Sequence, residues 1–343
     1  MIPWLKHIVV YTLENRSFDQ LLGQCPGVAG FGPDIRLAGP DGNGVSSFPM
    51  YRYSGSQCAN PTHTWVKIHE AWNQGGMDGF VKANGPDVMG YFPITRFPAF
   101  IKAVQEGIVL DRYFSSVLGP TMPNRLYQIA GTSHGLRDDP PIFGSDQFHM
   151  PTLFDQLSRH RVAWTYYIGD YGLGSIGRTI AKQALFCPLL WFPRFLRRPL
   201  NRHLMPLGGF FRDVQTRRLP AVSFLAPRYL RSAHPPFPVQ WGLASALHVL
   251  RTLRSSPLWK NTLYILQFDE AGGFFDPVPP PIVDSFGLGI RVPAVLWSGR
   301  AEPGVCHTVF DHTSVLRFIE EQYELPLLGE RTAQMASLAL ALV

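Results

Sequence analysis

The chain has 343 residues, of which 45% are hydrophobic and 13% aromatic. This length and composition allow a large buried core, which excludes an intrinsically disordered protein. The formal charge of +6 favours anionic partners but equally suits an ordinary basic surface. Pro, Arg or Asp interrupts every apolar stretch before the ~20 residues that a bilayer-crossing helix needs, so no transmembrane segment is expected.

The first predicted element is a strand over residues 6–13, an apolar and β-branched run that passes directly into ENRSFD. Glu14 and Asn15 therefore stand at its carboxyl end. The opening residues lack the basic start, apolar centre and small-residue cleavage site of an export signal, which favours a cytoplasmic protein unless the true start is missing.

Strands and helices then alternate along the chain. Further strands are predicted at residues 109–110, 221–225, 261–267 and 291–297, and helices at 101–106, 152–158, 243–254 and 314–323. This alternation predicts an α/β fold with a doubly wound, largely parallel sheet and helices on both faces. Ligands of such sheets bind outside the carboxyl ends of the strands.

A single domain over residues 1–343 is expected, because the stretches rich in Gly and Pro resemble long surface loops. A cap or interfacial insertion is predicted around residues 165–218. Within it, residues 184–211 interleave Leu, Phe and Trp with Arg, as in elements that meet anionic head groups at a membrane surface. An apolar segment packed on the sheet is the alternative, and its prolines argue against one long helix.

Two acidic pairs each follow an apolar strand: Glu14 with Asn15, and Asp269 with Glu270. Their hard oxygen atoms suit a divalent cation, and a doubly wound sheet would bring both pairs to one edge. Each pair alone has a simpler interpretation. ENRSFD could cap a helix, Asp269 and Glu270 could lie on the surface, and the two could also act as acid and base without a metal.

The segment GPTMPNR, residues 119–125, places a hydroxyl between rigid neighbours. A cation beside Thr121 would lower the pKa of its hydroxyl and make it a nucleophile. Arg125 could pair with phosphate oxygens in a forked geometry and Asn124 could donate a hydrogen bond to one of them, so both are candidate substrate ligands. As an isolated string, the segment is more often a turn than a site.

Seven blocks in chain order resemble the bacterial phospholipase C and acid phosphatase family, which includes the plant non-specific phospholipases C. They are ENRSFD (14–19), WNQGGMDGF (72–80), GPTMPNR (119–125), SFLAP (223–227), HPP (234–236), FDEAGGFFDPVPPP (268–281) and FDHTSVLRFIE (310–320). The resemblance implies a fold like that of the alkaline phosphatase superfamily, one divalent cation (Ca, Mg, Mn or Zn) and a phospho-threonine intermediate.

Transferred to this sequence, the family pattern makes Thr121 the nucleophile and implies catalytic roles for His63 and His234. The implied metal ligands are Glu14, Asn15, Thr121, Asp269 and Glu270. His312 would orient the loop before the last long helix, and Asp78 would anchor a wall of the cleft. The chain departs from the family at Ala271 and Pro277, where polar residues are usual, so a changed rate or substrate preference is expected.

Phospholipids and small phosphomonoesters both remain candidate substrates, and a non-catalytic anion- or lipid-binding protein is a third interpretation. Peripheral contact with a membrane is open, whereas nucleic-acid binding is not expected, because the sequence has no aromatic platform motif or zinc finger. The family is often secreted or periplasmic, which leaves the location undecided. A disulfide between Cys25 and Cys58 would fit an exported protein, but four free thiols are preferred.

Overall fold

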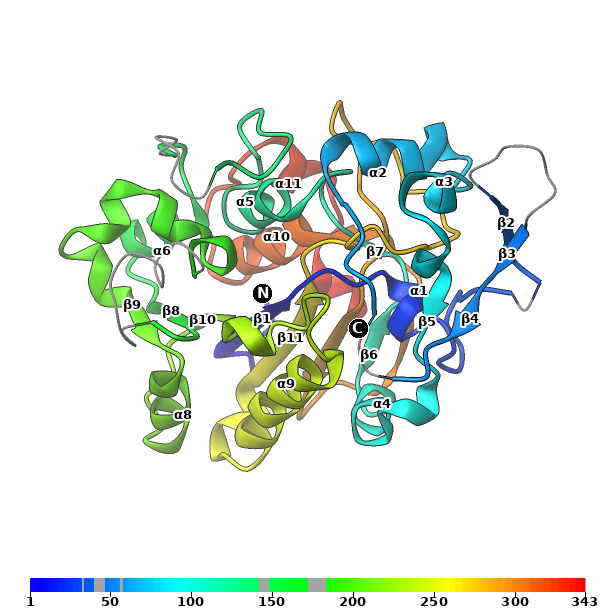
Figure 1. Ribbon diagram of the computed structural model, residues 1–343. Helices are drawn as coiled ribbons and strands as arrows, with labels where there is room; N and C mark the ends of the chain where they lie inside the picture. The colour runs from blue at the N-terminus through cyan, green and yellow to red at the C-terminus, as the bar shows by residue number, and fades with distance from the viewer. Residues whose placement is uncertain (33, 40–46, 56–57, 142–147, 172–182, 343) are drawn as a thin grey trace.

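The computed structural model describes residues 1–343 except 33, 40–46, 56–57, 142–147, 172–182 and 343. An eight-stranded sheet forms the centre of the molecule (Figure 1). In spatial order its strands are β13 (Gly304–Cys306), β6 (Ile108–Leu110), β12 (Ala294–Ser298), β11 (Thr262–Phe268), β1 (His7–Leu13), β10 (Val222–Ala226), β8 (Trp164–Ile168) and β9 (Leu204–Pro206). All neighbours run parallel except β12, which is antiparallel to both β11 and β6.

Helices cover both faces of this sheet (Figure 1). On the lower face in Figure 1 lie α4 (Pro98–Gln105), α8 (Gly208–Gln215) and α9 (Val239–Arg254), and on the other face α5 (Thr121–Ala130), α10 (His312–Gln322) and α11 (Glu330–Gln334). The remaining helices are α1 (Phe18–Leu21), α2 (Trp65–Trp72), α3 (Phe80–Asn84) and α6 (Leu153–Arg159). Short pairs are β2 (Arg36–Ala38) with β3 (Ser47–Pro49), β4 (Tyr51–Arg52) with β5 (Gly90–Tyr91), and β7 (Tyr113–Phe114) with β14 (Phe310–Asp311).

Burial explains why the central strands have few polar residues. Every residue of β11 is buried, as is all of β1 after His7, because helices pack on both sides. One continuous apolar cluster joins these strands to α4, α5, α9 and α10. The predicted α/β fold with a largely parallel sheet is therefore confirmed. Among the described residues, no helix combines the length and apolarity that spanning a bilayer requires.

The proline-rich residues 188–203 form short 3-10 turns instead of a long helix. They are η4 (Pro188–Trp191), η5 (Pro193–Leu196) and η6 (Leu200–His203), and proline is the first residue of η4 and η5 and directly precedes η6. Most large apolar side chains here, including Trp191, Phe192 and Phe195, are buried in the main cluster, whereas Leu196 is 50% exposed. The structure thus favours the packed alternative for the apolar residues 184–195, and β9 joins the central sheet. Residues 172–182 of the predicted insertion lie outside the described residues.

Cys25, Cys58, Cys187 and Cys306 are all free thiols, as preferred from the sequence.

Candidate active site

The two acidic pairs meet because their strands are parallel neighbours. In the β1 and β11 register, Leu13 stands opposite Phe268, so Glu14 and Asp269 leave the sheet side by side. The backbone N–H of Asn15 donates to Asp269 Oδ1 at 3.1 Å. Asn15 itself has φ 50°, a left-handed conformation that asparagine tolerates better than most residues. The lack of a side chain at Gly272 allows the two segments to lie close together, since a Cβ at this position would be 2.9 Å from the backbone oxygen of Asn15.

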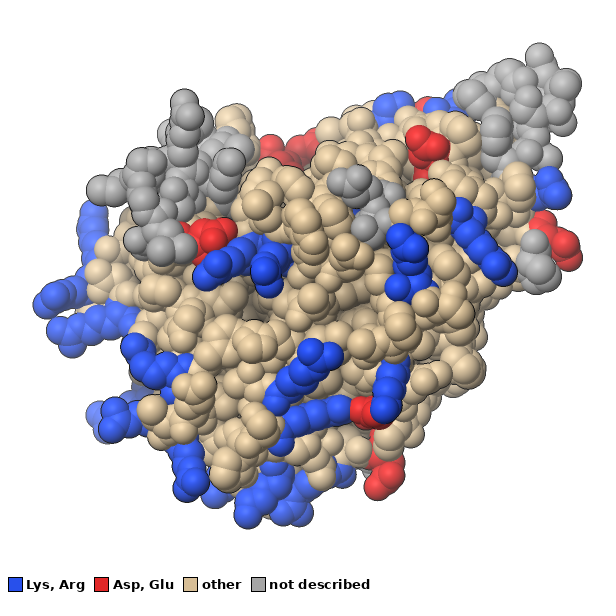
Figure 2. Space-filling model, turned by 60° about the horizontal axis from the view of Figure 1, so that its bottom comes forward, with Lys and Arg blue, Asp and Glu red and all other residues tan. Residues whose placement is uncertain are grey.

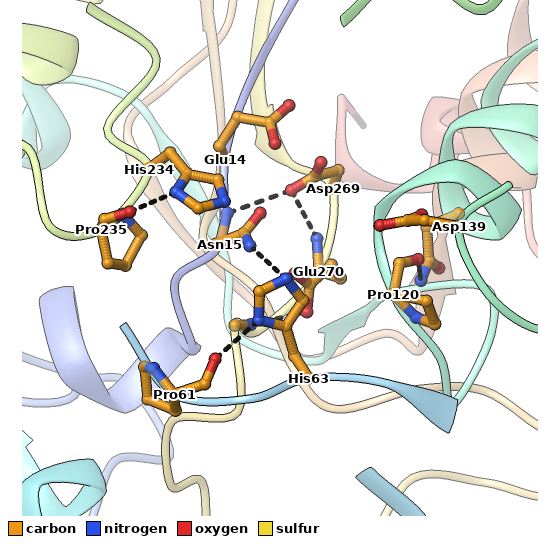
Figure 3. A network of polar contacts seen from close by, with 12 residues as sticks. Glu14, Asn15, Pro61, His63, Pro120, Asp139, His234, Pro235, Asp269 and Glu270 are labelled. Carbon is orange, nitrogen blue, oxygen red and sulfur yellow. Dashed lines mark hydrogen bonds and ion pairs between the residues drawn. The ribbon is translucent and has the colours of Figure 1, made fainter. Parts of the chain in front are cut away.

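Two oxygen atoms in this cluster have no hydrogen-bond partner among the described residues: Asn15 Oδ1 and Glu270 Oε1. Asn15 Nδ2 lies 3.1 Å from His63 Nε2, which leaves the amide oxygen on the other side (Figure 3). The second oxygen of Glu270 accepts from the Gly272 amide at 2.6 Å. Both residues are at most 1% exposed, so oxygens without a hydrogen bond destabilise the fold here, and His63 Nε2 lies 3.8 Å from Glu270 Oε1, too far for a hydrogen bond.

Arg125 lies between the pairs and compensates part of their charge. Its Nη2 bonds Glu14 Oε1, and its Nε donates to Asp269 Oδ2 at 3.1 Å, with all three side chains buried. Burial, followed by the charge of Asp269, raises the pKa of Glu14 well above its ordinary value, and Arg125 opposes this shift. The pKa of Glu270 is also raised well above its ordinary value, by burial and then by Asp269. The single positive charge of Arg125 therefore does not balance the negative charges of the carboxylates in this cluster.

The donor set fits a divalent cation on the evidence of these unpartnered atoms. Carboxylate and amide oxygens are ligands for hard cations, and a cation near Asn15 and Glu270 would satisfy the two orphan oxygens together. Within the described ranges, no three His, Cys, Asp or Glu side chains form a ready metal cluster. The three carboxylates of the predicted set therefore do not form one such cluster in this structure, where Arg125 already bonds Glu14 and Asp269.

Thr121 is the first residue of α5 and is 5% exposed. The segment for which an isolated turn was the simpler interpretation is therefore the first turn of a helix from Thr121 onward, with Pro123 inside that turn, where its missing N–H costs nothing. Arg125 stands one turn later on the same helix, and its bonds to Glu14 and Asp269 bring α5 to the acidic pairs. Backbone N–H groups of this helix end favour an anion near Thr121.

The side chains of Asn124 and Arg125, predicted as phosphate ligands, already have protein partners. Asn124 is fully buried, and its Nδ2 lies 2.9 Å from Gly119 oxygen and 3.0 Å from Pro120 oxygen. Its Oδ1 accepts from the Val117 amide at 2.9 Å. In this structure Asn124 thus shapes the loop that leads into Thr121.

Asn124→Ala is expected to lower kcat by roughly 10- to 100-fold, because a displaced nucleophile loses its alignment. Lost hydrogen bonds should cost about 1–3 kcal/mol of unfolding free energy. Steady-state kinetics and urea denaturation measure the two effects. A variant with lowered stability but unchanged kcat at a temperature where it is folded would contradict the positioning role.

Asp139 belongs to the site although its sequence context does not indicate it. Its Oδ1 accepts from the Met122 amide at 2.6 Å, so it caps the helix end that carries Thr121. Figure 3 shows Asp139 beside Pro120, across from Asp269 and Glu270. Burial raises its pKa, and the Met122 amide opposes the shift. The two residues are 17 positions apart in the sequence, so no local pattern could have revealed the contact.

The two predicted histidines flank the acidic pairs (Figure 3), with ring centroids 6.0 Å apart. Each uses Nδ1 on a backbone carbonyl: His63 on Pro61 oxygen at 2.8 Å, and His234 on Pro235 oxygen. If both Nδ1 atoms carry the proton, both Nε2 atoms are left as acceptors toward the site. Burial lowers the pKa of His234 to about 4, so it is neutral near pH 7.

The sequence also singled out three other residues. His312 is buried, and its Nε2 lies 2.9 Å from Phe268 oxygen, which ties the start of α10 to the end of β11. Asp78 accepts from Asn73 Nδ2 at 2.7 Å in the loop between α2 and α3. Ala271 lines an apolar void of about 10 Å³. A polar residue there would thus face apolar neighbours.

Comparisons with known proteins show what this chain is similar to. Residues 5–326 match the phosphoesterase family. Phospholipase C B of Mycobacterium tuberculosis is 31% identical over 393 residues, covering 94% of this chain and 74% of that protein. Non-specific phospholipase C6 of Arabidopsis thaliana is 28% identical, covering 94% and 68%.

Among solved structures, Ps i-CgsB is similar with a TM-score of 0.51 and 9% identity, covering 98% of this chain and 76% of that one, which shows a shared fold alone. A Vibrio parahaemolyticus protein of the alkaline phosphatase superfamily has a TM-score of 0.46 at 10% identity, with 97% and 71% covered.

The match over nearly the whole length, together with relatives at about 30% identity, places this chain in the phosphoesterase family as a phosphoric ester hydrolase.

Proposed function

We propose that this chain is a metal-dependent phospholipase C that cleaves a phospholipid into diacylglycerol and a phosphorylated head group. The observation that carries the proposal is the meeting of Glu14, Asn15, Asp269 and Glu270 with two unpartnered oxygens, beside the helix that begins at Thr121. The phospholipases C among its relatives support the lipid substrate. A bound divalent cation would supply a Lewis acid that stabilises the alkoxide of Thr121 and the charge of the phosphoryl group.

We assign the remaining chemical steps to side chains of the protein. Thr121 Oγ forms a bond to phosphorus while the bond from phosphorus to the glycerol oxygen breaks, and the hydroxyl proton passes to the leaving glycerol oxygen. Nε2 of His63 or His234 would carry that proton, because Nδ1 of each ring already contacts a backbone carbonyl. Water then attacks the phosphothreonine, which releases the phosphorylated head group and returns a proton to Thr121.

Asn15 and Glu270 would hold the cation through their free oxygens, with Glu14 and Asp269 beside them. Arg125 keeps these two carboxylates oriented and partly neutralised, which fits a supporting role behind the reacting atoms. The helix end at Thr121, with its backbone N–H groups, would receive the phosphate oxygens once the substrate displaces Asp139 or shares its position.

A substrate panel tests the proposal. Chelation is expected to lower turnover by roughly 10³-fold or more, and restoring the correct cation should recover it. Phosphatidylcholine, p-nitrophenyl phosphate and its phosphodiester should be compared after chelation and with Ca, Mg, Mn or Zn restored. Release of diacylglycerol supports the phospholipase C assignment. Turnover of the monoester alone would replace it with a phosphatase, and full turnover after chelation would contradict metal dependence.

A further inference from the structure

A cationic pocket lies apart from the acidic pairs, between α8, α9 and the turn η7 (Tyr229–Arg231). It measures about 290 Å³, and Arg228, Arg231, Ser245 and His248 contribute its polar lining. No carboxylate is among its described lining residues. Arg228 Nε is 3.8 Å from Asp170 Oδ1, outside the lining, in a pair whose side chains are 57% and 32% exposed. The pocket therefore offers positive charge to a solvent-borne anion.

The pocket walls are fixed before any ligand arrives. Ser245 Oγ lies 2.8 Å from the hydroxyl of Tyr11 on β1, and the rings of Phe211 and His248 lie 4.6 Å apart. The Glu14 amide donates to Ser232 oxygen at 2.8 Å, which ties the segment after η7 to the end of β1. A preorganised anion site loses less entropy when its ligand binds.

Two large apolar side chains next to this pocket are exposed: Leu230 at 51% and Trp241 at 43%. Leu230 stands between the arginines on η7, and Trp241 lies in the first turn of α9, the helix that carries Ser245 and His248. All eight tryptophans of the sequence are described, and among them only Trp241 is exposed, whereas the others are buried or half-buried. Exposed Trp and Leu beside Arg are typical of surfaces that enter the interfacial layer of a bilayer.

Positive charge predominates around the pocket, although Asp170 lies 3.8 Å from Arg228 and Asp213 lies 3.6 Å from Arg212. Figure 2 shows the lower side of the molecule, where Lys and Arg gather and acidic side chains are sparse. The exposed arginines of this region include Arg212, Arg217 and Arg218 after or on α8, and Arg251 on α9. A surface of this charge is attracted to anionic phospholipids.

We propose that the segment from Arg228 to Trp241, with the pocket beside it, is the surface through which the protein docks on an anionic phospholipid bilayer. Arg228 and Arg231 bind a lipid phosphate, while Leu230 and Trp241 enter the interfacial layer. The same segment carries His234, so docking brings the acidic pairs close to the lipid surface. This inference rests on the proposed lipid substrate.

Vesicle binding tests the inference in a Thr121→Ala background, where the proposed turnover cannot change the lipids. Vesicles of phosphatidylcholine are compared with vesicles that also contain phosphatidylglycerol. Binding to the anionic vesicles is expected to be at least tenfold tighter, with a blue shift of tryptophan emission that Trp241→Phe removes. Arg231→Gln should weaken this binding by about tenfold. Arg251→Gln removes the same charge from the surface of α9 outside the pocket and should weaken it by less than about threefold.

Equal losses for the two arginine variants would overturn the inference, because they would indicate general charge attraction only. Equal binding to both vesicle types would overturn it as well. So would full competition by inorganic phosphate or glycerol phosphate, which would identify a site for free phosphate.

Activity on a soluble short-chain substrate separates this inference from the proposed function. With Thr121 restored, Arg231→Gln should keep the wild-type kcat/KM on that substrate. A matching loss on soluble substrate would overturn the docking role. Failure of the wild type to hydrolyse any phospholipid, with the vesicle results intact, would instead refute the proposed function.

Discussion

Thr121→Ala is expected to reduce phosphoester turnover by roughly 10⁴-fold or more, whereas Thr121→Ser should retain turnover within about 100-fold of the wild type. Alanine lacks the hydroxyl that would attack phosphorus, and serine keeps it at the same position of α5. Neither change removes a helix cap, because the N-cap residue is Pro120 and makes no side-chain cap bond. The melting temperature should therefore stay close to that of the wild type.

The measurement combines kinetics with direct detection of the intermediate. Acid quenching of the wild type during turnover, followed by mass spectrometry of the peptide that contains Thr121, should reveal a phosphorylated threonine. Thr132, two residues after the end of α5, provides the control, since Thr132→Ala removes a half-buried hydroxyl that accepts from the His134 amide at 3.0 Å. Retained turnover in Thr121→Ala, or a phosphoryl group on another residue, would show that the nucleophile is assigned wrongly.

Arg291→Met is expected to destabilise the fold by about 3–5 kcal/mol, the largest stability effect we predict for a single side chain here. Arg291 is completely buried, with Nε 2.8 Å from Asp276 Oδ1 and Nη2 3.1 Å from Asp19 Oδ1. Burial and the charge of Asp276 already raise the pKa of Asp19 to about 8, and Arg291 opposes that shift. Removing the guanidinium leaves two buried carboxylates without a cation.

Urea denaturation followed by circular dichroism measures this loss. Arg251→Met is the matched control, because it makes the same substitution at an exposed position and should change stability by less than about 0.5 kcal/mol. If Arg291→Met does not fold at all, Arg291→Lys keeps the charge but not the forked geometry and should show an intermediate loss. Equal stability of Arg291→Met and the wild type would contradict the proposed role of the ion cluster.

The Arg291 cluster also fixes the backbone next to the candidate active site. Asp19 belongs to α1, which begins three residues after Asn15, and Ser17 Oγ donates to Phe275 oxygen at 2.7 Å. The Phe18 amide donates to Arg291 oxygen at 3.0 Å. These contacts hold the chain on both sides of the two acidic pairs, so Arg291 variants that still fold should also bind the proposed cation less tightly.

Strands that could be predicted were those with an unbroken apolar run followed by polar residues. Residues 6–13 and 261–267 match β1 and β11 within one residue at each end, because strands covered on both faces need a continuous apolar sequence. The strand predicted at 291–297 begins three residues later, at Ala294. Its antiparallel direction could not be predicted, since periodicity carries no information about the direction of a neighbour.

Local patterns failed where partners are distant in sequence. GPTMPNR has two prolines and favoured a turn, yet the structure begins α5 at Thr121. The Arg and Leu pattern of residues 184–211 was compatible with an interface or with a core, and burial of Trp191 and Phe192 favoured the core. Propensity and charge are local quantities, whereas the choice between these states depends on which surfaces the rest of the chain presents.

The sequence alone was enough to predict an α/β sheet, two oxygen-bearing pairs at strand ends and the hydroxyl of Thr121 as the candidate nucleophile. Strand periodicity and the chemistry of metal or phosphate ligands can be recognised from residues that are consecutive in the chain. The tertiary structure decided that Arg125 compensates Glu14 and Asp269, that Asn124 shapes the loop before Thr121, and that Asp139 caps α5. These roles follow from the register of parallel strands and the path of long loops, which create contacts between residues that no local pattern relates.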